Sequence, residues 1–269
     1  MKRSITLAVV ALFALSAPAL FAQEHQHEAM TAASTHAAYA ARGTTVALHG
    51  TAGDGSGYLS LPSDKQAKHP ALIVIQEWWG VNDWIKQQTD RFAGQGYVAL
   101  AVDLYRGKVA NDAELAHELM RGLPADRGVA DLKSGVDYLA SRSDVDPERI
   151  GVIGWCMGGG YSLQLAINDP RIAACVINYG TLVTDPATID KIKPPILGNF
   201  GELDRGIPPS DVKAFEAALI KAGKTADIKI YGGAGHAFEN PNNTQGYVPA
   251  AAKDAEARID AFFARTVRR

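Results

Sequence analysis

Three residues of the types that carry out nucleophilic catalysis occur in this sequence in the order nucleophile, acid and histidine. Cys156 lies between Gly154 and Gly158, a spacing typical of a sharp strand-to-helix turn that presents a reactive side chain. Glycines suit that turn because side chains two residues from the nucleophile would collide with the adjoining strand and helix. Asp204 and His236 follow. The order nucleophile, acid, histidine predicts acyl transfer, in which histidine accepts the thiol proton and aspartate orients the imidazole.

Each of these residues also has an ordinary explanation. The segment around Cys156 could be a glycine-rich turn with a buried structural thiol. Asp204 could cap the next helix or occupy a turn, and His236 could be a surface loop residue. The three together, each placed after a predicted strand, favour the catalytic interpretation.

The elements that must position these residues alternate between strands and helices. Predicted strands cover 44–49, 57–61, 71–76, 97–102, 150–153, 172–178, 196–200 and 227–231; predicted helices cover 83–93, two stretches of 111–141, 161–167, 211–222 with Ser210 as its N-cap, and 248–265. Such alternation indicates an α/β fold with a mostly parallel central sheet flanked by helices, built as a single domain over residues 44–269. Polar residues follow several strands, where functional groups of open parallel sheets gather: Glu77, Asp103, Cys156, Asp204 and His236.

The composition is that of an ordinary globular protein, with 47% hydrophobic and 21% charged residues. The net charge of -2 argues against nucleic acid or an anionic membrane surface as the main partner. Neither a metal nor an organic cofactor is implied. Cys156 and Cys175 are expected to be free thiols, because a disulfide would distort the turn at Cys156, and Cys175 reads as buried core.

The N-terminus is typical of a secretory signal. Lys2 and Arg3 precede a short apolar run and then small residues, so residues 1–22 are predicted to be a signal peptide cleaved after Ala22, with Ala19 as the alternative site. A retained membrane anchor is the competing interpretation. Residues 23–43 are expected to be a flexible segment. The protein is thus expected to be exported to a bacterial periplasm, with no stable membrane span after signal removal.

The motifs also resemble those of one known family, the dienelactone hydrolases of the α/β-hydrolase superfamily. The similar segments span residues 44–269: Q-E-W-W-G-V-N at 76–82, D-L-Y-R-G at 103–107, G-W-C-M-G-G-G at 154–160, G-E-L-D at 201–204 and G-H-A-F at 235–238. The resemblance implies an α/β-hydrolase fold and hydrolysis of an ester or lactone through a cysteine thioester, of the carboxymethylenebutenolidase type. It makes Cys156 the nucleophile, His236 the base and Asp204 its orienting acid. Glu77 would be the carboxylate that interacts with the thiol in the resting enzyme.

An oxyanion hole for this chemistry is predicted from two backbone N–H groups, those of Trp78 and Met157. Four side chains are candidates for substrate binding, although the tryptophans among them could equally be core residues: Trp79, Trp155, Arg106 and Phe238. The sequence departs from the family where the family has a serine and an arginine after the catalytic histidine, since Ala237 and Asn240 stand there. Losing that arginine weakens the expectation of a carboxylate-bearing substrate.

Two other functions remain open. The chain could be a carboxylesterase or thioesterase of broad specificity, or a non-catalytic relative that binds a ligand or senses oxidants through Cys156. The expected partner is a small ester or lactone. The natural substrate and the oligomeric state are not indicated by the sequence.

Overall fold

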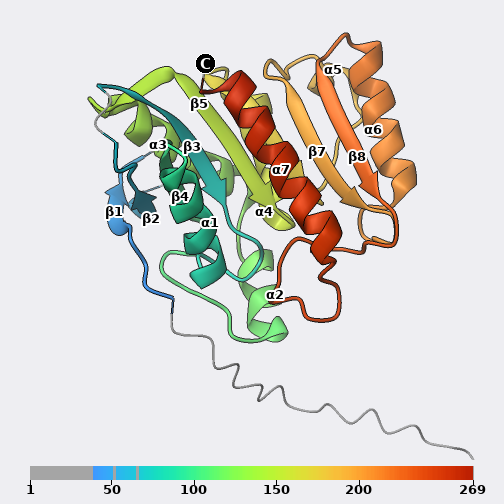
Figure 1. Ribbon diagram of the computed structural model, residues 1–269, viewed down its shortest axis with the longest axis horizontal. Helices are drawn as coiled ribbons and strands as arrows, with labels where there is room; N and C mark the ends of the chain where they lie inside the picture. The colour runs from blue at the N-terminus through green and yellow to red at the C-terminus, as the bar shows by residue number, and fades with distance from the viewer. Residues whose placement is uncertain (1–38, 51–52, 65–66, 269) are drawn as a thin grey trace, which may run out of the picture. The chain divides into compact units, whose positions relative to one another are not determined.

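The computed structural model describes residues 39–50, 53–64 and 67–268. Their strands form one eight-stranded sheet in the order β1-β2-β4-β3-β5-β6-β7-β8 (Figure 1). The strands are β1 (Thr44–Leu48), β2 (Gly55–Ser60), β3 (His69–Ile75), β4 (Val98–Asp103), β5 (Val145–Trp155), β6 (Ile172–Asn178), β7 (Ile196–Gly201) and β8 (Ala226–Tyr231). The helices are α1 (Asp83–Gly94), α2 (Ala113–Arg121), α3 (Ala125–Ser141), α4 (Met157–Asn168), α5 (Pro186–Ile189), α6 (Pro209–Lys221) and α7 (Pro249–Thr266).

The predicted mostly parallel sheet is confirmed. Strands β3 to β8 all run in one direction, and the β1–β2 hairpin is antiparallel and pairs with β4 antiparallel. The carboxyl ends of the six parallel strands therefore meet at one edge of the sheet, where ligands bind in open α/β sheets.

Helices cover both faces of the sheet, which explains why its central strands are apolar throughout. Every residue of β3 is buried. Leu72 and Val74 pack in the layer that contains α1 and α7, while Ile73 and Ile75 pack in the layer that contains α3, α4 and α6. In Figure 1, α1 and α7 cross the near face of the sheet. A strand buried on both sides reads as a continuous hydrophobic run, as this one does.

Two predicted helix starts are wrong: α4 begins at Met157 rather than at 161, and α6 begins before the predicted 211. The sequence pattern favours Ser210 as the N-cap of a helix at 211–222, but α6 begins at Pro209 and its N-cap is Pro208. Proline suits the first turn of a helix because its φ angle is already helical and its missing N–H would have no intrahelical acceptor there. The Ser210 hydroxyl instead contacts the carboxylate of Asp211 at 3.2 Å.

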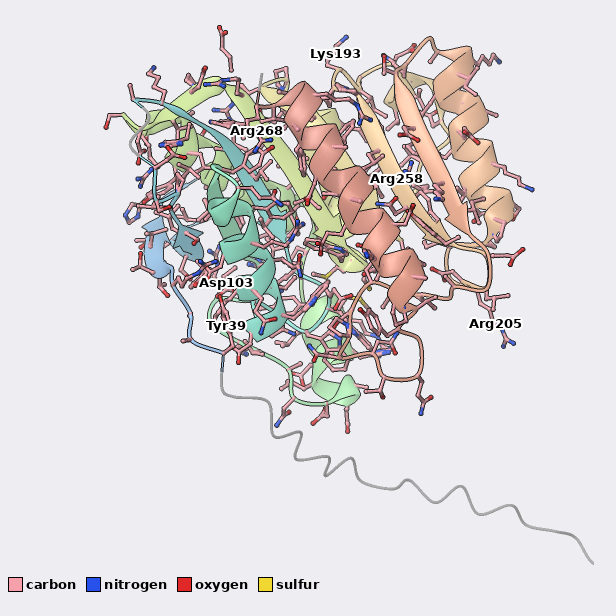
Figure 2. The ribbon with its side chains drawn as sticks, in the orientation of Figure 1. Tyr39, Asp103, Lys193, Arg205, Arg258 and Arg268 are labelled. Atoms are coloured by element: carbon pink, nitrogen blue, oxygen red, sulfur yellow. The ribbon has the colours of Figure 1, made fainter. Side chains whose placement is uncertain are left out.

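Helix α7 is anchored to the last strands by an arginine. The guanidinium of Arg258 donates to Asn199 on β7 at 2.6 Å and to Asp227 on β8 at 2.5 Å (Figure 2). The segment 232–248 connects β8 to α7 and is called the histidine loop below because it carries His236. Across the described part of the chain, no helix is long and apolar enough to cross a membrane. The predicted signal peptide lies outside the described residues.

Candidate active site

Cys156 occupies a strained turn between a strand and a helix. It is the single residue between β5 and α4, with φ 55° and ψ −120°. A Cβ atom on Gly154 would lie 2.1 Å from the carbonyl oxygen of Gly158, and one on Gly158 would lie 2.4 Å from the carbonyl oxygen of Gln76. Both glycines are therefore required by close backbone contacts, as the sequence pattern predicts. The turn holds the thiol at the N-terminus of α4, where the helix dipole favours negative charge.

Asp204 and His236 are joined by a hydrogen bond. Nδ1 of His236 lies 2.7 Å from Oδ2 of Asp204. The other oxygen of Asp204 accepts from the backbone N–H groups of Gly206 at 2.8 Å and Ile207 at 3.1 Å. Burial opposes ionisation of this carboxyl, but the hydrogen bond and charge of His236, together with the two amides, outweigh it and lower the pKa of Asp204. Asp204 is thus held as a carboxylate with one oxygen directed at the imidazole.

His236 lies between this carboxylate and the thiol. Burial disfavours the imidazolium, yet hydrogen bonds to Asp204 and to Cys156, and the charges of both groups, raise the pKa of His236 to about 10. The ring packs edge-on against Tyr179, with centroids 5.3 Å apart, and 41% of the His236 side chain is exposed. The imidazole therefore binds a proton firmly, interacts electrostatically with Cys156 and remains accessible to a substrate.

Glu77 is a buried acid at the end of β3, and its bonded partner is Asn240 of the histidine loop. Nδ2 of Asn240 donates to Oε2 of Glu77 at 2.7 Å, while Oε1 has no partner among the described residues. Burial raises the pKa of Glu77 to about 7, and the Asn240 bond and the charge of His236 reduce the shift only in part. The protonation state of this carboxyl therefore changes near neutral pH. Its contact with the thiol stays a prediction.

The two amides predicted to form an oxyanion hole lie at the ends of neighbouring strands. Met157 is the first residue of α4, so its N–H has no acceptor inside the helix. Trp78 lies in the turn after β3, the strand that pairs with β5. Its ring packs edge-on against Trp79 at 4.9 Å and against His117 of α2 at 4.7 Å. Both N–H groups therefore come from the edge of the sheet that carries Cys156.

Of the four candidate substrate-binding side chains, three are held in contacts within the protein. Trp155 is almost completely buried, Phe238 is fully buried beside Tyr179 and Tyr231, and Arg106 forms an ion pair with Asp131 at 2.6 Å. Trp79 is partly exposed in the turn after β3. Trp79 and Arg106 are therefore the partly exposed members of the four, and the roles of all four in binding stay predictions.

Asp103, another carboxylate at a strand end, closes a local turn. Its Oδ1 accepts from the N–H of Tyr105 at 2.9 Å and its Oδ2 from that of Gly107 at 2.5 Å (Figure 2). Cys175 is a free, fully buried thiol on β6, and Cys156 is also free, as expected. Burial raises the pKa of the Cys175 thiol, which makes it inert.

Sequence reasoning missed three residues beside this centre. Tyr179, directly after β6, packs on His236 from a backbone with φ 39°. The sequence marks Asn240 only as a departure from the family, and it does not single out Glu239, whose buried carboxyl accepts from the indole of Trp155 at 2.9 Å. These contacts link segments far apart in the chain, so no local pattern signals them. Within the described residues, no group of three or more His, Cys, Asp or Glu side chains could hold a metal ion.

Known proteins are similar to this chain in sequence and in fold. A model of the dienelactone hydrolase family matches residues 56–267. Two bacterial proteins provisionally named carboxymethylenebutenolidase are similar: one from Methylorubrum extorquens is 31% identical, covering 77% of this chain and 75% of that protein, and one from Salmonella typhimurium is 34% identical, covering 77% and 82%. The crystal structure of a provisionally named dienelactone hydrolase from Klebsiella pneumoniae superposes with a TM-score of 0.76 at 29% identity, covering 83% of this chain and 98% of that one.

Proposed function

This chain belongs to the dienelactone hydrolase family, and we propose that it hydrolyses a carboxylic ester or lactone through a thioester on Cys156. One observation carries the proposal. His236 is hydrogen-bonded to Asp204 at 2.7 Å, and its pKa is raised in part by interaction with Cys156, which sits in a strained turn at a helix N-terminus. A nucleophile, a base that contacts it and a third group that orients the base are the parts that nucleophilic acyl transfer needs.

The proposed reaction proceeds in two halves. His236 accepts the thiol proton, and the thiolate of Cys156 attacks the acyl carbon to form a tetrahedral oxyanion. The oxyanion accepts hydrogen bonds from the N–H groups of Met157 and Trp78. Its collapse breaks the ester C–O bond, and the leaving alkoxide takes the proton from His236. Water, deprotonated by His236, then hydrolyses the thioester, and the thiolate is released with the free acid.

Asp204 and Glu77 have different tasks in this proposal. Asp204 stabilises the imidazolium and fixes its orientation, since its carboxylate is anchored by two backbone amides. Glu77 is a buried carboxyl whose pKa is about 7, because burial disfavours its charge. When ionised it disfavours the thiolate, so we propose that it keeps Cys156 less reactive until substrate binds.

The substrate proposed here has an uncharged acyl group. Asn240 stands where the family has an arginine, and its side-chain amide is already used to bind Glu77. The position therefore supplies no cation for a substrate carboxylate. The partly exposed Trp79 beside Trp78 offers an aromatic surface instead. A broad-specificity carboxylesterase or thioesterase is the second candidate, and it would use the same catalytic residues.

Turnover of p-nitrophenyl acetate and butyrate, and of lactones with and without a carboxylate, tests the proposal. Cys156→Ala and His236→Ala should each lower kcat/KM by about 1,000-fold or more, because each removes an essential part of the nucleophile. Cys175→Ala is the matched control, since it removes the buried thiol far from these contacts and should leave kcat/KM unchanged. Turnover that survives Cys156→Ala would exclude the thioester. Thermal stabilisation by an ester without any turnover would support a binding protein instead.

A further inference from the structure

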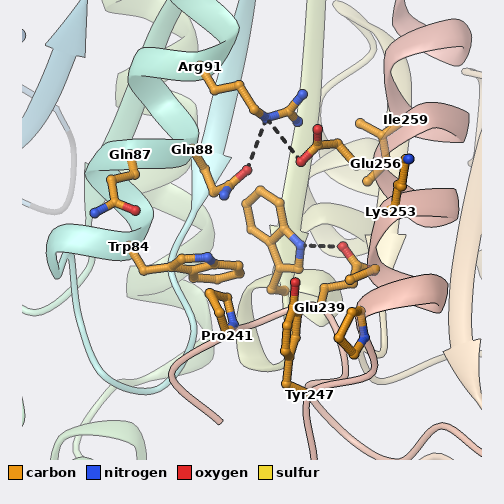
Figure 3. Close-up of a pocket in the computed structure, with 13 residues that line it drawn as sticks. Trp84, Gln87, Gln88, Arg91, Glu239, Pro241, Tyr247, Lys253, Glu256 and Ile259 are labelled. Carbon is orange, nitrogen blue, oxygen red and sulfur yellow. Dashed lines mark hydrogen bonds and ion pairs between the residues drawn. The ribbon is translucent and has the colours of Figure 1, made fainter. Parts of the chain in front are cut away.

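One hydrogen bond joins the histidine loop to the strand that ends at the nucleophile. The indole N–H of Trp155 donates to Oε2 of Glu239 at 2.9 Å, across 84 residues of sequence (Figure 3). Trp155 immediately precedes Cys156, and Glu239 follows His236 by three residues. This bond therefore connects the two chain segments whose side chains would have to exchange a proton.

The histidine loop is braced internally, so its parts move together. The amide of Asn243 donates to the carbonyl oxygens of His236 at 3.1 Å and Ala237 at 3.3 Å. The N–H of Val248 donates to the carbonyl oxygen of Phe238 at 3.1 Å. A shift at Glu239 would consequently be transmitted to the backbone that carries the imidazole.

The indole of Trp155 is held by close packing and by its hydrogen bond to Glu239. Trp84 packs edge-on against it with ring centroids 5.2 Å apart, but both rings and Glu239 border a pocket of about 280 Å³ between α1 and α7 (Figure 3). An almost completely buried indole has few alternative rotamers, and the hydrogen bond adds a defined direction to this packing. The dashed line that ends on Glu239 in Figure 3 marks this hydrogen bond.

We propose that Glu239 is a positioning residue, which holds the loop of His236 against the Cys156 turn through its hydrogen bond to Trp155. This inference rests on the proposed function, because it assigns Glu239 a part in aligning the base with the nucleophile. Glu239 touches neither the thiol nor the imidazole in this scheme. Displacing reacting groups by about 1 Å is enough to lower a rate by about a hundredfold.

The chemical state of Glu239 suggests a conservative variant. Burial raises the pKa of this carboxyl to about 8, although the Trp155 bond opposes the shift, so at pH 7 the group is largely neutral. Glutamine has the same shape and an uncharged carbonyl oxygen that can accept from the indole. Alanine removes the acceptor, and phenylalanine at position 155 removes the donor while keeping an aromatic ring.

The experiment compares Glu239→Ala, Glu239→Gln, Trp155→Phe and the double variant Glu239→Ala/Trp155→Phe. Hydrolysis of p-nitrophenyl acetate and the pH profile of Cys156 alkylation by iodoacetamide are measured, with melting temperatures to verify folding. Glu239→Ala should lower kcat by about 10- to 100-fold with KM changed by less than about twofold. Glu239→Gln should restore kcat to within about twofold of wild type. Trp155→Phe should resemble Glu239→Ala, and the double variant should lose no more than either single variant.

Glu256→Ala is the control, because Glu256 borders the same pocket but bonds to Arg91 rather than to Trp155. The proposal is overturned if Glu239→Ala lowers only the melting temperature and leaves kcat and the alkylation profile unchanged, or if Glu239→Gln is as impaired as Glu239→Ala. Should Glu239→Ala not fold, a folded Trp155→Phe with wild-type kcat and alkylation overturns it equally. If the wild type shows no turnover, the proposed function fails, whereas the alkylation profile still decides whether Glu239 aligns His236 with Cys156.

Discussion

At the scale of single residues, the unusual feature is a set of buried acids around the candidate site. Glu77 and Glu239 both have buried carboxyls, and burial raises their pKa values to about 7 and about 8. Asp204 differs because two backbone amides and His236 stabilise its charge and lower its pKa. Environments that push the pKa values of similar groups apart are typical of catalytic centres.

Glu77→Gln should make the protein more stable at alkaline pH. The pKa of Glu77 is raised from 4.5 to about 7 in the folded state. The stability that this group contributes is therefore fully present below pH 4.5 and is lost as the pH rises through 7. Glutamine removes this loss, so the unfolding free energy should rise relative to wild type by up to about 3 kcal/mol at about pH 8.5 and by much less at about pH 5.

Urea denaturation at the two pH values measures this difference. The same variant should be alkylated by iodoacetamide at Cys156 faster than wild type, because the opposing carboxylate is gone. An equal effect on stability at both pH values would show that Glu77 does not titrate as described. An unchanged alkylation rate would remove its proposed influence on the thiol.

At the scale of elements, the Cys156 turn depends on close contact between β5, α4 and the turn after β3. A Cβ on Gly154 would meet the backbone oxygen of Gly158 at 2.1 Å, a contact that no side-chain movement can relieve. Gly154→Ala should thus force the strand and helix apart and destabilise the fold by about 3 kcal/mol. A Cβ on Gly94, at the end of α1, would meet no atom within 4 Å, so Gly94→Ala is the matched control.

Thermal or urea unfolding measures the stability of the Gly154→Ala and Gly94→Ala variants relative to wild type. Gly94→Ala should be neutral or slightly stabilising, because alanine is the better helix former. A Gly154→Ala variant as stable as wild type would mean that the turn tolerates a wider separation than the structure shows.

The elements themselves are largely predictable from the sequence, and their arrangement is not. Continuous apolar runs such as 71–76 and the glycine spacing around Cys156 are local signals, so the strands and the turn can be expected from the sequence. The position of β4 between β2 and β3 depends on pairing between distant segments, for which no local pattern exists. The start of α6 is misplaced by sequence reasoning because a serine is preferred as a cap over consecutive prolines.

At the scale of the whole molecule, the candidate site is assembled from segments that meet only on folding. That Glu77, Cys156, Asp204 and His236 share one edge follows from the parallel sheet. The bonds that set their spacing are not foreseeable, because Asn240 reaches Glu77 across 163 residues of sequence. The sequence thus indicates which residues lie near one another. The tertiary contacts that set the distances between them are seen only in the structure.

We propose that the protein acts after export, which residues 1–22 would direct. The chain should be found in the periplasm of a bacterial host as a protein that begins at Gln23, or at Leu20 if cleavage follows Ala19. Leu12→Asp places a charge in the apolar run and should retain the uncleaved chain inside the cell. Ala33→Asp adds the same charge beyond the predicted cleavage site and should not affect export.

Cell fractionation and the mass of the intact protein provide the measurement. A membrane fraction that holds the uncleaved wild-type chain would instead establish a retained anchor.

Export would require Cys156 to remain a reduced thiol in a compartment where disulfides form. Its partner for a disulfide within the chain would be Cys175, which is fully buried in β6 and remains a free thiol. Thiol titration of the exported protein should therefore give two free cysteines after denaturation, of which only Cys156 reacts in the folded state.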